Sequence, residues 1–248
     1  MEESDIFEGI TYQCERLNQP GINGRVHLVT VDLTTPGLEL YTTPLDEHAV
    51  AAGWQYRPRW APGIAQDQSL SIMVNGTLFK TLRSLTLFPG DWARSNETVI
   101  SDHQVSHIDP RSFLMSFSDN LTPHLEKVRP PSPEVCLQTR WGIGGQEILV
   151  DRGEVFVHAT DILDKRTLIG IDPGRKLLFL AVFEDSSLKA AAYYMIAHGA
   201  RDATMLDGGD STCLVIGQGA RGIIARPLVY PSRTTATVFG VRAPKLTH

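Results

Sequence analysis

The sequence predicts an α+β (mixed α/β) fold: a single domain with a largely antiparallel, twisted sheet, one clear crossover helix and long loops. Three observations support this prediction. Runs of apolar and β-branched residues recur along the chain, separated by Gly, Pro and Asp. Two pairs of such runs are joined by turns short enough to make hairpins. One helical segment lies between two further runs, as expected for a crossover between strands.

The composition is that of a globular domain. The chain has 248 residues, of which 42% are hydrophobic and 21% charged, so it can bury a substantial core without disulfides or metals. A Pro-rich stretch at residues 129–133 is expected to be a loop, because too little chain lies on either side to form independent cores. We therefore expect one domain over residues 10–243, with flexible termini at 1–9 and 244–248.

The first half reads as short strands followed by a long excursion. Pro58 and Pro62 interrupt the segment 49–68, which is expected to be helical or irregular. Residues 81–112 are polar and weakly periodic, and loops of that length in compact domains are usually functional or disordered. The strands expected in this half are 26–33, 38–42 and 70–74.

The second half gives clearer signals. The turns Asp151-Arg152-Gly153 and Pro173-Gly174 each separate two apolar runs. A helix is expected to begin after a cap at Asp185 or Ser186 and to end at Gly199 in a left-handed conformation. The expected elements are strands at 147–150, 154–157, 166–172, 176–183, 203–206, 212–216 and 236–241, and a helix at 187–198.

Charge argues against nucleic acid as a partner. The net charge is −5, and a mildly acidic chain lacks the basic face that phosphate backbones require. The charge is uneven, because the 37 residues after Ser211 contain no Asp or Glu and carry +5, against −10 for the rest. A basic stretch beside a candidate site favours an anionic ligand, although these bases can equally neutralise the acidic remainder.

No segment predicts a membrane span or a secretion signal. The longest apolar run, 190–197, is far too short to span a membrane. The acidic start of the chain lacks the basic and apolar parts of a signal peptide, so we expect a cytoplasmic protein or one secreted with its leader removed. The three cysteines are far apart and match no zinc or disulfide pattern. No cofactor or metal is expected, and the oligomeric state is left open.

The sharpest motif is Leu-Asp-Gly-Gly-Asp-Ser-Thr at residues 206–212, directly after a predicted strand. Gly208 and Gly209 allow a tight turn and the close approach of a ligand. Asp207 and Asp210 place two carboxylates beside them. Because ligands often bind where strands end in Gly-rich turns, this segment is expected to be functional.

Ser211 is not expected to be the nucleophile of an α/β-hydrolase. Cys213 stands where that motif has its last Gly, and no acid follows Ser211 in the chain.

Two further motifs lie on predicted strands. Arg166 and Thr167 open one strand, and the Arg fork can hold phosphate or carboxylate at two points. Asn75 and Gly76 end another, and an Asn amide there can hold a sugar hydroxyl or a phosphate oxygen. Taken alone, a surface Arg and a plain Asn-Gly turn explain these residues equally well.

Together these segments resemble the phosphodiester glycosidase family, which is related to the mannose-6-phosphate uncovering enzyme. That family carries an Asn-Gly-Gly-aromatic-Phe strand end, an Arg-Thr-x-x-Gly strand and a Leu-Asp-Gly-Gly-Gly-Ser turn. This chain has similar segments in the same order, and the resemblance covers roughly residues 10–243. The matching segments are 75–79, 166–170 and 206–211, supported by 143–145, 151–153, 199–203 and 232–234.

The resemblance implies a hydrolase that cleaves a sugar-1-phosphodiester at the anomeric carbon, releasing free sugar and a phosphomonoester. Its substrate would be a small molecule or glycan bearing a sugar phosphate. The departing phosphate ester needs little proton donation, an arginine can neutralise it, and a carboxylate supports the oxocarbenium-like transition state. The implied catalytic residues are Asp207 and, as second acid/base, Asp210. The implied substrate-binding residues are Asn75, Gly76, Arg166, Thr167, Gly208, Gly209, Ser211 and Arg233.

The chain departs from the family pattern at three positions. Thr77 and Leu78 replace a Gly and an aromatic residue, and Asp210 replaces a Gly. Two alternatives therefore stay open. One is a sugar-phosphate-binding module without catalysis, which would bind without turnover. The other is a metal-dependent phosphodiesterase in which Asp207 and Asp210 share a divalent ion, which a chelator would inactivate.

Overall fold

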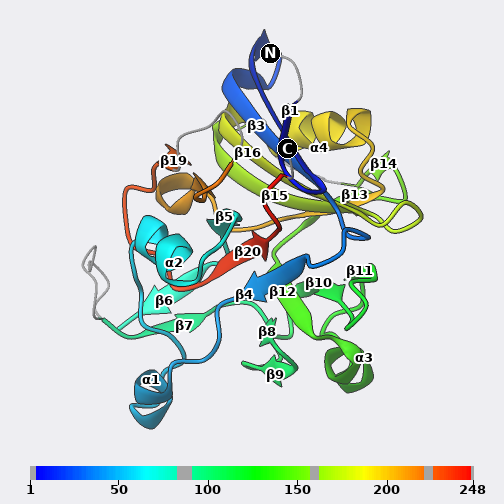
Figure 1. Cartoon of the computed structure of the whole chain (residues 1–248). Helices are drawn as coiled ribbons and strands as arrows, with labels where there is room; N and C mark the ends of the chain where they lie inside the picture. Colours follow the sequence, from blue (N-terminus) through cyan, green and yellow to red (C-terminus); the bar gives the residue numbers. More distant parts are fainter. Residues whose placement is uncertain (1–3, 83–90, 157–161, 221–225, 247–248) are drawn as a thin grey trace.

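The protein is built mainly from β-strands (Figure 1). The computed structural model describes residues 4–82, 91–156, 162–220 and 226–246. Over these residues the strands form four sheets, and every pairing is antiparallel. The predicted α+β class with one crossover helix is therefore wrong, and the fold is β-rich. Several polar segments without a strong strand signal pair with distant strands and complete the sheets.

The largest sheet has the order β1-β2-β3-β16-β15-β17-β13-β14. In β1, Ile6 and Phe7 are buried, in a segment for which the sequence predicted a flexible terminus. Residue 157, at the end of the predicted strand 154–157, lies outside the described residues. The strands of this sheet are β1 (Ser4–Phe7), β2 (Ile10–Gln19), β3 (Ile22–Asp32), β13 (Ile148–Asp151), β14 (Glu154–Val155), β15 (Asp164–Asp172), β16 (Leu177–Ser186) and β17 (Asp202–Met205).

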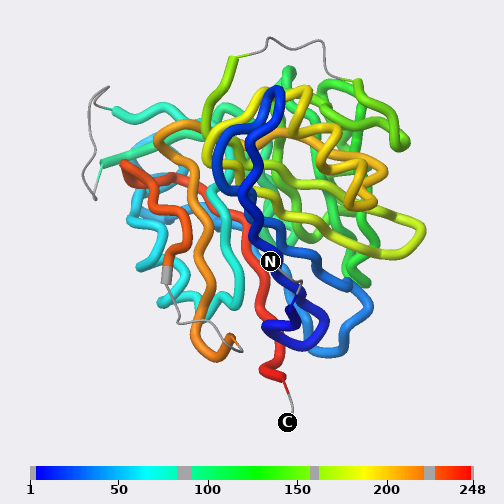
Figure 2. The backbone as a smooth tube through the Cα atoms, turned by 90° about the horizontal axis from the view of Figure 1, so that it is seen from above, coloured from blue at the N-terminus to red at the C-terminus, as the bar shows by residue number. Residues whose placement is uncertain are grey.

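The second sheet has the order β19-β18-β5-β20-β4, and Figure 2 shows β18, β5 and β20 side by side in orange, cyan and red. The third has the order β11-β10-β12-β8-β9, and β6 pairs with β7 alone. Their strands are β4 (Glu39–Thr42), β5 (Ile72–Asn75), β6 (Phe79–Thr81), β7 (Ala93–Ser95), β8 (Val99–Ser101), β9 (Gln104–Val105), β10 (Phe113–Phe117), β11 (Pro123–Glu126), β12 (Trp141–Gly145), β18 (Leu214–Ile216), β19 (Arg226–Val229) and β20 (Val238–Arg242).

The described helices are short. Pro62 lies in the first turn of α2, where a missing N–H costs nothing. The Pro-rich stretch 129–133 leads into α3, which Ser132 caps and Pro133 begins. None of the described helices is both long and apolar enough to span a membrane. The helices are α1 (Glu47–Ala51), α2 (Ala61–Asp67), α3 (Pro133–Gln138) and α4 (Leu188–Ala197), with a 3-10 turn η1 (Gly209–Ser211).

The central strands of the largest sheet are buried on both faces. On one face, side chains such as Leu168 and Phe183 pack against Ala191 and Met195 of α4, which lies over this sheet in Figure 1. On the other face, the strands pack against the second and third sheets. Strands covered on both sides read as uninterrupted apolar runs, which explains the apolar sequence at 177–183.

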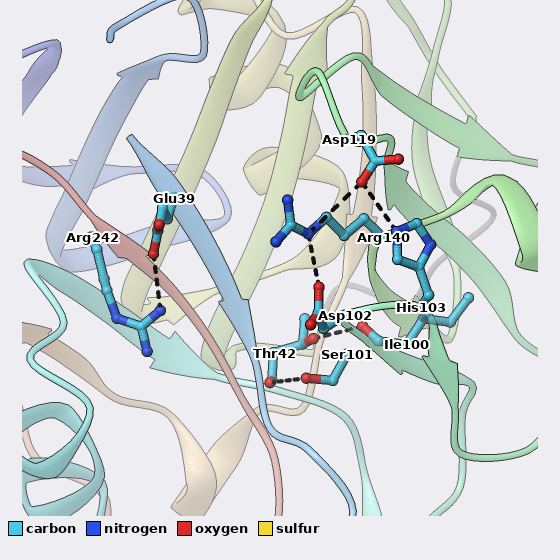
Figure 3. Close-up of polar contacts among 9 residues, drawn as sticks. All are labelled: Glu39, Thr42, Ile100, Ser101, Asp102, His103, Asp119, Arg140 and Arg242. Atoms are coloured by element: carbon cyan, nitrogen blue, oxygen red, sulfur yellow. Dashed lines mark hydrogen bonds and ion pairs between the residues drawn. The ribbon is translucent and has the colours of Figure 1, made fainter. Parts of the chain in front are cut away.

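Side-chain bonds join the second and third sheets between β4 and β8 (Figure 3). The Thr42 hydroxyl donates to the Ile100 carbonyl at 2.6 Å, and the Ser101 hydroxyl donates to the Thr42 carbonyl at 2.8 Å. Nearby, Arg140 Nε donates to Asp102 at 2.9 Å on the protein surface. Because buried hydrogen bonds contribute more than exposed ion pairs, the two hydroxyls are the stronger link.

The cap of α4 differs from the prediction by one or two residues. The sequence predicted Asp185 or Ser186, but the side chain of Ser187 accepts the Ala190 N–H at 3.3 Å. Gly199 follows the helix with φ +100°, as predicted for a left-handed C-terminal residue.

Ser187→Ala should lower the free energy of unfolding by about 1 kcal/mol, because it removes the cap hydrogen bond. Asp185→Ala should change it by less than about 0.5 kcal/mol, since that side chain does not cap the helix. Urea unfolding of both variants measures the difference. A larger loss in Asp185→Ala than in Ser187→Ala would contradict the assigned cap.

Candidate active site

Asn75, the last residue of β5, joins three other segments. Its Nδ2 donates to the backbone carbonyl of Asp207 at 2.6 Å. Its Oδ1 accepts the hydroxyl of Thr167 on β15 at 2.7 Å and the N–H of Cys213 at 3.1 Å. The side chain is fully buried, so these three bonds use its amide for structure. Asn75 therefore fixes the place of the loop that carries Asp207.

Gly76 brings the start of β20 against the same loop. Its N–H donates to the carbonyl of Thr237 at 2.8 Å, and its carbonyl accepts the N–H of Asp207 at 2.9 Å. A Cβ at this position would lie 2.5 Å from Thr237 Oγ1 and 2.9 Å from its backbone carbon. Only glycine fits here, which explains the Asn-Gly pair at the end of the strand.

The loop after β17 places an acid just beneath the surface. Asp207 is 5% exposed, whereas Asp210 three residues later is exposed. Gly208 donates its N–H to Asp207 Oδ1 at 2.9 Å, and a Cβ there would lie 2.8 Å from the Lys165 carbonyl. Gly209 has φ +56°. Both glycines are thus required by the backbone, as the motif predicted.

One carboxyl oxygen of Asp207 has no hydrogen-bond partner in the described part of the chain. Its Oδ2 is buried and makes no hydrogen bond with any described residue. Burial raises the pKa of Asp207 above its ordinary value, while the nearby Ser211 hydroxyl, the charge of Arg233 and the Gly208 N–H oppose that rise. The guanidinium of Arg233 lies 4.3 Å from the ring centroid of Phe79. Because the charge of Arg233 acts on the pKa of Asp207, this cation lies close to the Asp207 carboxyl group.

A second buried acid, Glu97, was missed by the sequence analysis. It is 6% exposed, and its Oε2 also has no hydrogen bond to a described residue. Burial raises its pKa to about 8, helped by the negative charges of Asp207 and Asp109. The Leu78 backbone and Arg111 only partly oppose this rise in pKa. A pKa of about 8 favours the protonated form of Glu97 at neutral pH, and the charge of Asp207 is near enough to contribute to it.

The glycine pair at the end of β12 makes room for Glu97. A Cβ on Gly144 would lie 2.5 Å from the Cβ of Glu97 and 2.4 Å from Ser112 Oγ. A Cβ on Gly145 would lie 2.0 Å from Thr204 Oγ1. These contacts give a physical reason for the Gly-Gly segment that the sequence showed at this place.

No local motif marks Glu97 in the sequence. It lies between β7 and β8, within the polar excursion predicted at 81–112, of which residues 83–90 lie outside the described part. The only available signal was the length of that excursion, which favoured a functional segment. A single Glu in a polar stretch could not be singled out further.

The structure gathers most of the predicted site residues but separates two of them. Arg166 precedes Thr167 on β15 and so points to the opposite face of the sheet. Its Nε donates to the Ser186 carbonyl at 3.3 Å and its Nη2 to the Ile162 carbonyl at 3.2 Å. The side chain of Asp210 is exposed. The residues that come together are Asn75, Gly76, Thr167, Asp207, Gly208, Gly209, Ser211 and Arg233.

Among the described residues, neither a metal cluster nor either of two surface hollows coincides with these acids. In the described ranges, no three His, Cys, Asp or Glu side chains gather closely enough to hold a metal ion. One hollow of about 220 Å³ lies beside Arg140 and Trp141, and another of about 570 Å³ lies between Phe7 and Lys245. Neither lining contains Glu97 or Asp207.

Comparison with known families settles the classification of the chain. The sequence model of the phosphodiester glycosidase family matches residues 68–242. The chain belongs to the phosphodiester glycosidase family. The resemblance seen in the sequence is thereby confirmed, and the matched region contains Asn75, Glu97 and Asp207. No curated protein matches the chain.

Two solved structures share the fold of this phosphodiester glycosidase family member at low sequence identity. A hypothetical protein from Synechocystis superposes with a TM-score of 0.72 and 16% identity, over 94% of this chain and 62% of that one. The catalytic domain of zebrafish N-acetylglucosamine-1-phosphodiester alpha-N-acetylglucosaminidase, auto-inhibited by its pro-peptide, superposes with a TM-score of 0.69 and 14% identity, over 99% of this chain and 88% of that one. The chain thus spans under two thirds of the Synechocystis protein.

Asn75→Ala should lower the free energy of unfolding by about 3 kcal/mol, because it leaves the Thr167 hydroxyl, the Cys213 N–H and the Asp207 carbonyl without a partner. Asn23→Ala, at an exposed position, is the matched control and should cost less than about 0.5 kcal/mol. Urea unfolding measures both. Equal stability of the two variants would show that the Asn75 bonds do not hold the site.

Proposed function

We propose that this protein hydrolyses a sugar-1-phosphodiester at the anomeric carbon and releases the free sugar and a phosphomonoester. The observation that carries the proposal is the pair of nearly buried carboxyl groups of Glu97 and Asp207, each with an unbonded oxygen, next to the cation of Arg233. Paired carboxyl groups are the usual means of glycoside hydrolysis. Membership of the phosphodiester glycosidase family supports the same reaction class.

The two acids hold different protonation states. Neighbouring carboxyl groups disfavour double ionisation, so one of them retains a proton. The raised pKa of Glu97, about 8, makes Glu97 the protonated member. Burial raises the pKa of Asp207, whereas the Ser211 hydroxyl, the charge of Arg233 and the Gly208 N–H favour its charged form. Glu97 therefore acts as a hydrogen-bond donor and Asp207 as the carboxylate.

The reaction follows from these states. Asp207 accepts a proton from the water whose oxygen attacks the anomeric carbon. The bond from that carbon to the phosphate oxygen breaks, and its electron pair leaves with the phosphate. Arg233 neutralises the departing group, and neutral Glu97 donates a hydrogen bond to it without repelling it. The products are the free sugar and the phosphomonoester.

The other residues of the site have supporting roles. Gly208, Gly209 and Ser211 shape the turn on which Asp207 is carried. Asn75 and Thr167 fix the position of that turn through hydrogen bonds. Asp210 is exposed at the surface end of the loop. The family resemblance implied Asp210 as the second acid/base group, and we assign that role to Glu97 instead. Arg166 supports the neighbouring backbone and is left out of the phosphate site.

Asp207→Asn should reduce kcat at least about 100-fold, because it removes the group that accepts the water proton. The assay is release of free sugar from a panel of sugar-1-phosphodiesters, nucleotide sugars included, with and without chelator. Asp210→Asn is the matched control and should retain activity within about threefold, a barrier change of under 1 kcal/mol. Wild-type activity should survive the chelator.

Three other outcomes of this assay would contradict the proposal. Unchanged turnover in Asp207→Asn would remove the carboxylate from the mechanism. Binding without turnover in the wild type would favour a binding module, and loss of activity with chelator would favour a metal-dependent phosphodiesterase.

Glu97→Gln should remove a pH dependence of stability. The folded protein keeps a proton on Glu97 up to a pKa of about 8, whereas an unfolded chain releases it near 4.5. The free energy of unfolding should therefore fall as pH rises between these values, by up to about 1.4 kcal/mol per pH unit. Urea unfolding at pH 5, 7 and 9 should show the wild type losing stability relative to Glu97→Gln. Parallel curves would contradict a buried, protonated Glu97.

A further inference from the structure

Three buried hydroxyl groups lead in a row to the backbone of Glu97. Thr237 Oγ1 lies 2.8 Å from Thr77 Oγ1, which lies 2.7 Å from Ser95 Oγ. Ser95 Oγ in turn donates to the Glu97 carbonyl at 2.6 Å. All three hydroxyl residues are at most 3% exposed. The row joins the start of β20, the segment after β5 and the end of β7.

The direction of every proton in this row is determined. The backbone carbonyl of Glu97 can only accept a hydrogen bond, so the Ser95 hydroxyl must donate its single proton to that carbonyl. Thr77 must then donate to Ser95, and Thr237 must donate to Thr77. Two backbone groups fit the same direction, because Thr77 N–H donates to Thr237 Oγ1 at 2.9 Å and Glu97 N–H donates to Ser95 Oγ at 3.1 Å.

Ser95 is also held from its backbone. Its N–H donates to Gln55 Oε1 at 2.8 Å, which leaves Gln55 Nε2 facing His107 Nδ1 at 3.0 Å as the donor. His107 Nδ1 must therefore accept, which requires the neutral ring. Burial lowers the pKa of His107 and favours that form. Ser95 is thus held through its hydroxyl by Thr77 and through its backbone N–H by Gln55, two residues before Glu97.

We propose that Thr77 is a positioning residue for Glu97: through Ser95 it fixes the backbone from which the Glu97 side chain reaches toward Asp207. The Oε2 atom of Glu97 has no hydrogen bond to a described residue, so the position of the carboxyl group depends on the Leu78 backbone hydrogen bond and on the backbone of Glu97 itself. The inference rests on the proposed function, in which Glu97 faces the departing phosphate.

The row depends on the hydroxyl of Thr77. A Gly at this position would have no hydroxyl to donate to Ser95. Without that donor, Ser95 loses one of its contacts, and the segment carrying Glu97 gains freedom to move toward water. A more hydrated Glu97 would titrate nearer to its ordinary pKa.

The test compares three variants. Thr77→Val keeps the shape and removes the hydroxyl, whereas Thr77→Ser keeps the hydroxyl. Thr139→Val is the matched control, because the Thr139 hydroxyl is buried and donates to the Val135 carbonyl at 2.7 Å in α3, outside the row. The carboxyl carbon of Glu97 is titrated by 13C NMR and assigned by its absence in Glu97→Gln.

The expected result is a fall of at least one unit in the Glu97 pKa in Thr77→Val, with wild-type titration in Thr77→Ser and Thr139→Val. This measurement needs no substrate, so it stands even where no sugar phosphodiester is turned over. With an active substrate, Thr77→Val should lower kcat about tenfold at unchanged KM and shift the alkaline limb of the pH profile by the same amount as the NMR titration.

Wild-type titration of Glu97 in folded Thr77→Val would overturn the proposal. If Thr77→Val does not fold, Ser95→Ala removes the last hydroxyl of the row and is measured in the same way. A lowered Glu97 pKa in Ser95→Ala supports the row as the positioning device, and an unchanged one overturns it.

Discussion

The amide of Asn75 is the contact on which the rest of the site depends. It ties the end of β5 to β15, to the loop after β17 and to the start of β18. Each of these segments is also held by a sheet whose side chains are buried. The position of Asp207 is therefore set by the packing of the sheets, and a rigid framework of this kind suits a site that must present an acid at a fixed place.

Burial of two acids whose charges interact has a cost in stability. Glu97 is kept neutral in the fold although it ionises readily in water, so the folded state is weakened as pH rises. In the proposed reaction, the same burial supplies a hydrogen-bond donor near Asp207. Such opposed environments are typical of acid and base pairs in enzymes. In the proposed positioning role, Thr77 and Ser95 fix the backbone of Glu97 through their hydroxyl groups.

Local signals predicted part of the fold and of the site. The hairpin at Pro173-Gly174 and helix α4 follow from strong periodicity with clear turns, and Gly208 marks the loop of Asp207 because the backbone itself needs glycine there. Strand β2 was missed because it is largely polar and is recognised only by its pairing with β3. The predicted α+β class was wrong because strands held by long-range pairing make up much more of the described fold than helices do.

Nonlocal contacts account for the remaining differences at the site. Glu97 becomes significant only where Gly144, distant in sequence, leaves space for it. Arg166 was assigned to the phosphate because an Arg fork can hold phosphate at two points. Strand alternation instead gives the inner face to Thr167, whose hydroxyl bonds to Asn75. Neither fact is readable from spacing alone.

In the proposed reaction, the bond between the anomeric carbon and the phosphate oxygen breaks. Hydrolysis of a sugar-1-phosphodiester in water enriched in oxygen-18, followed by mass spectrometry of both products, shows which bond is broken. Attack on the anomeric carbon places the label in the released sugar, which is the predicted result. Label in the phosphate product would mean attack on phosphorus and would contradict the roles given to Asp207 and Glu97.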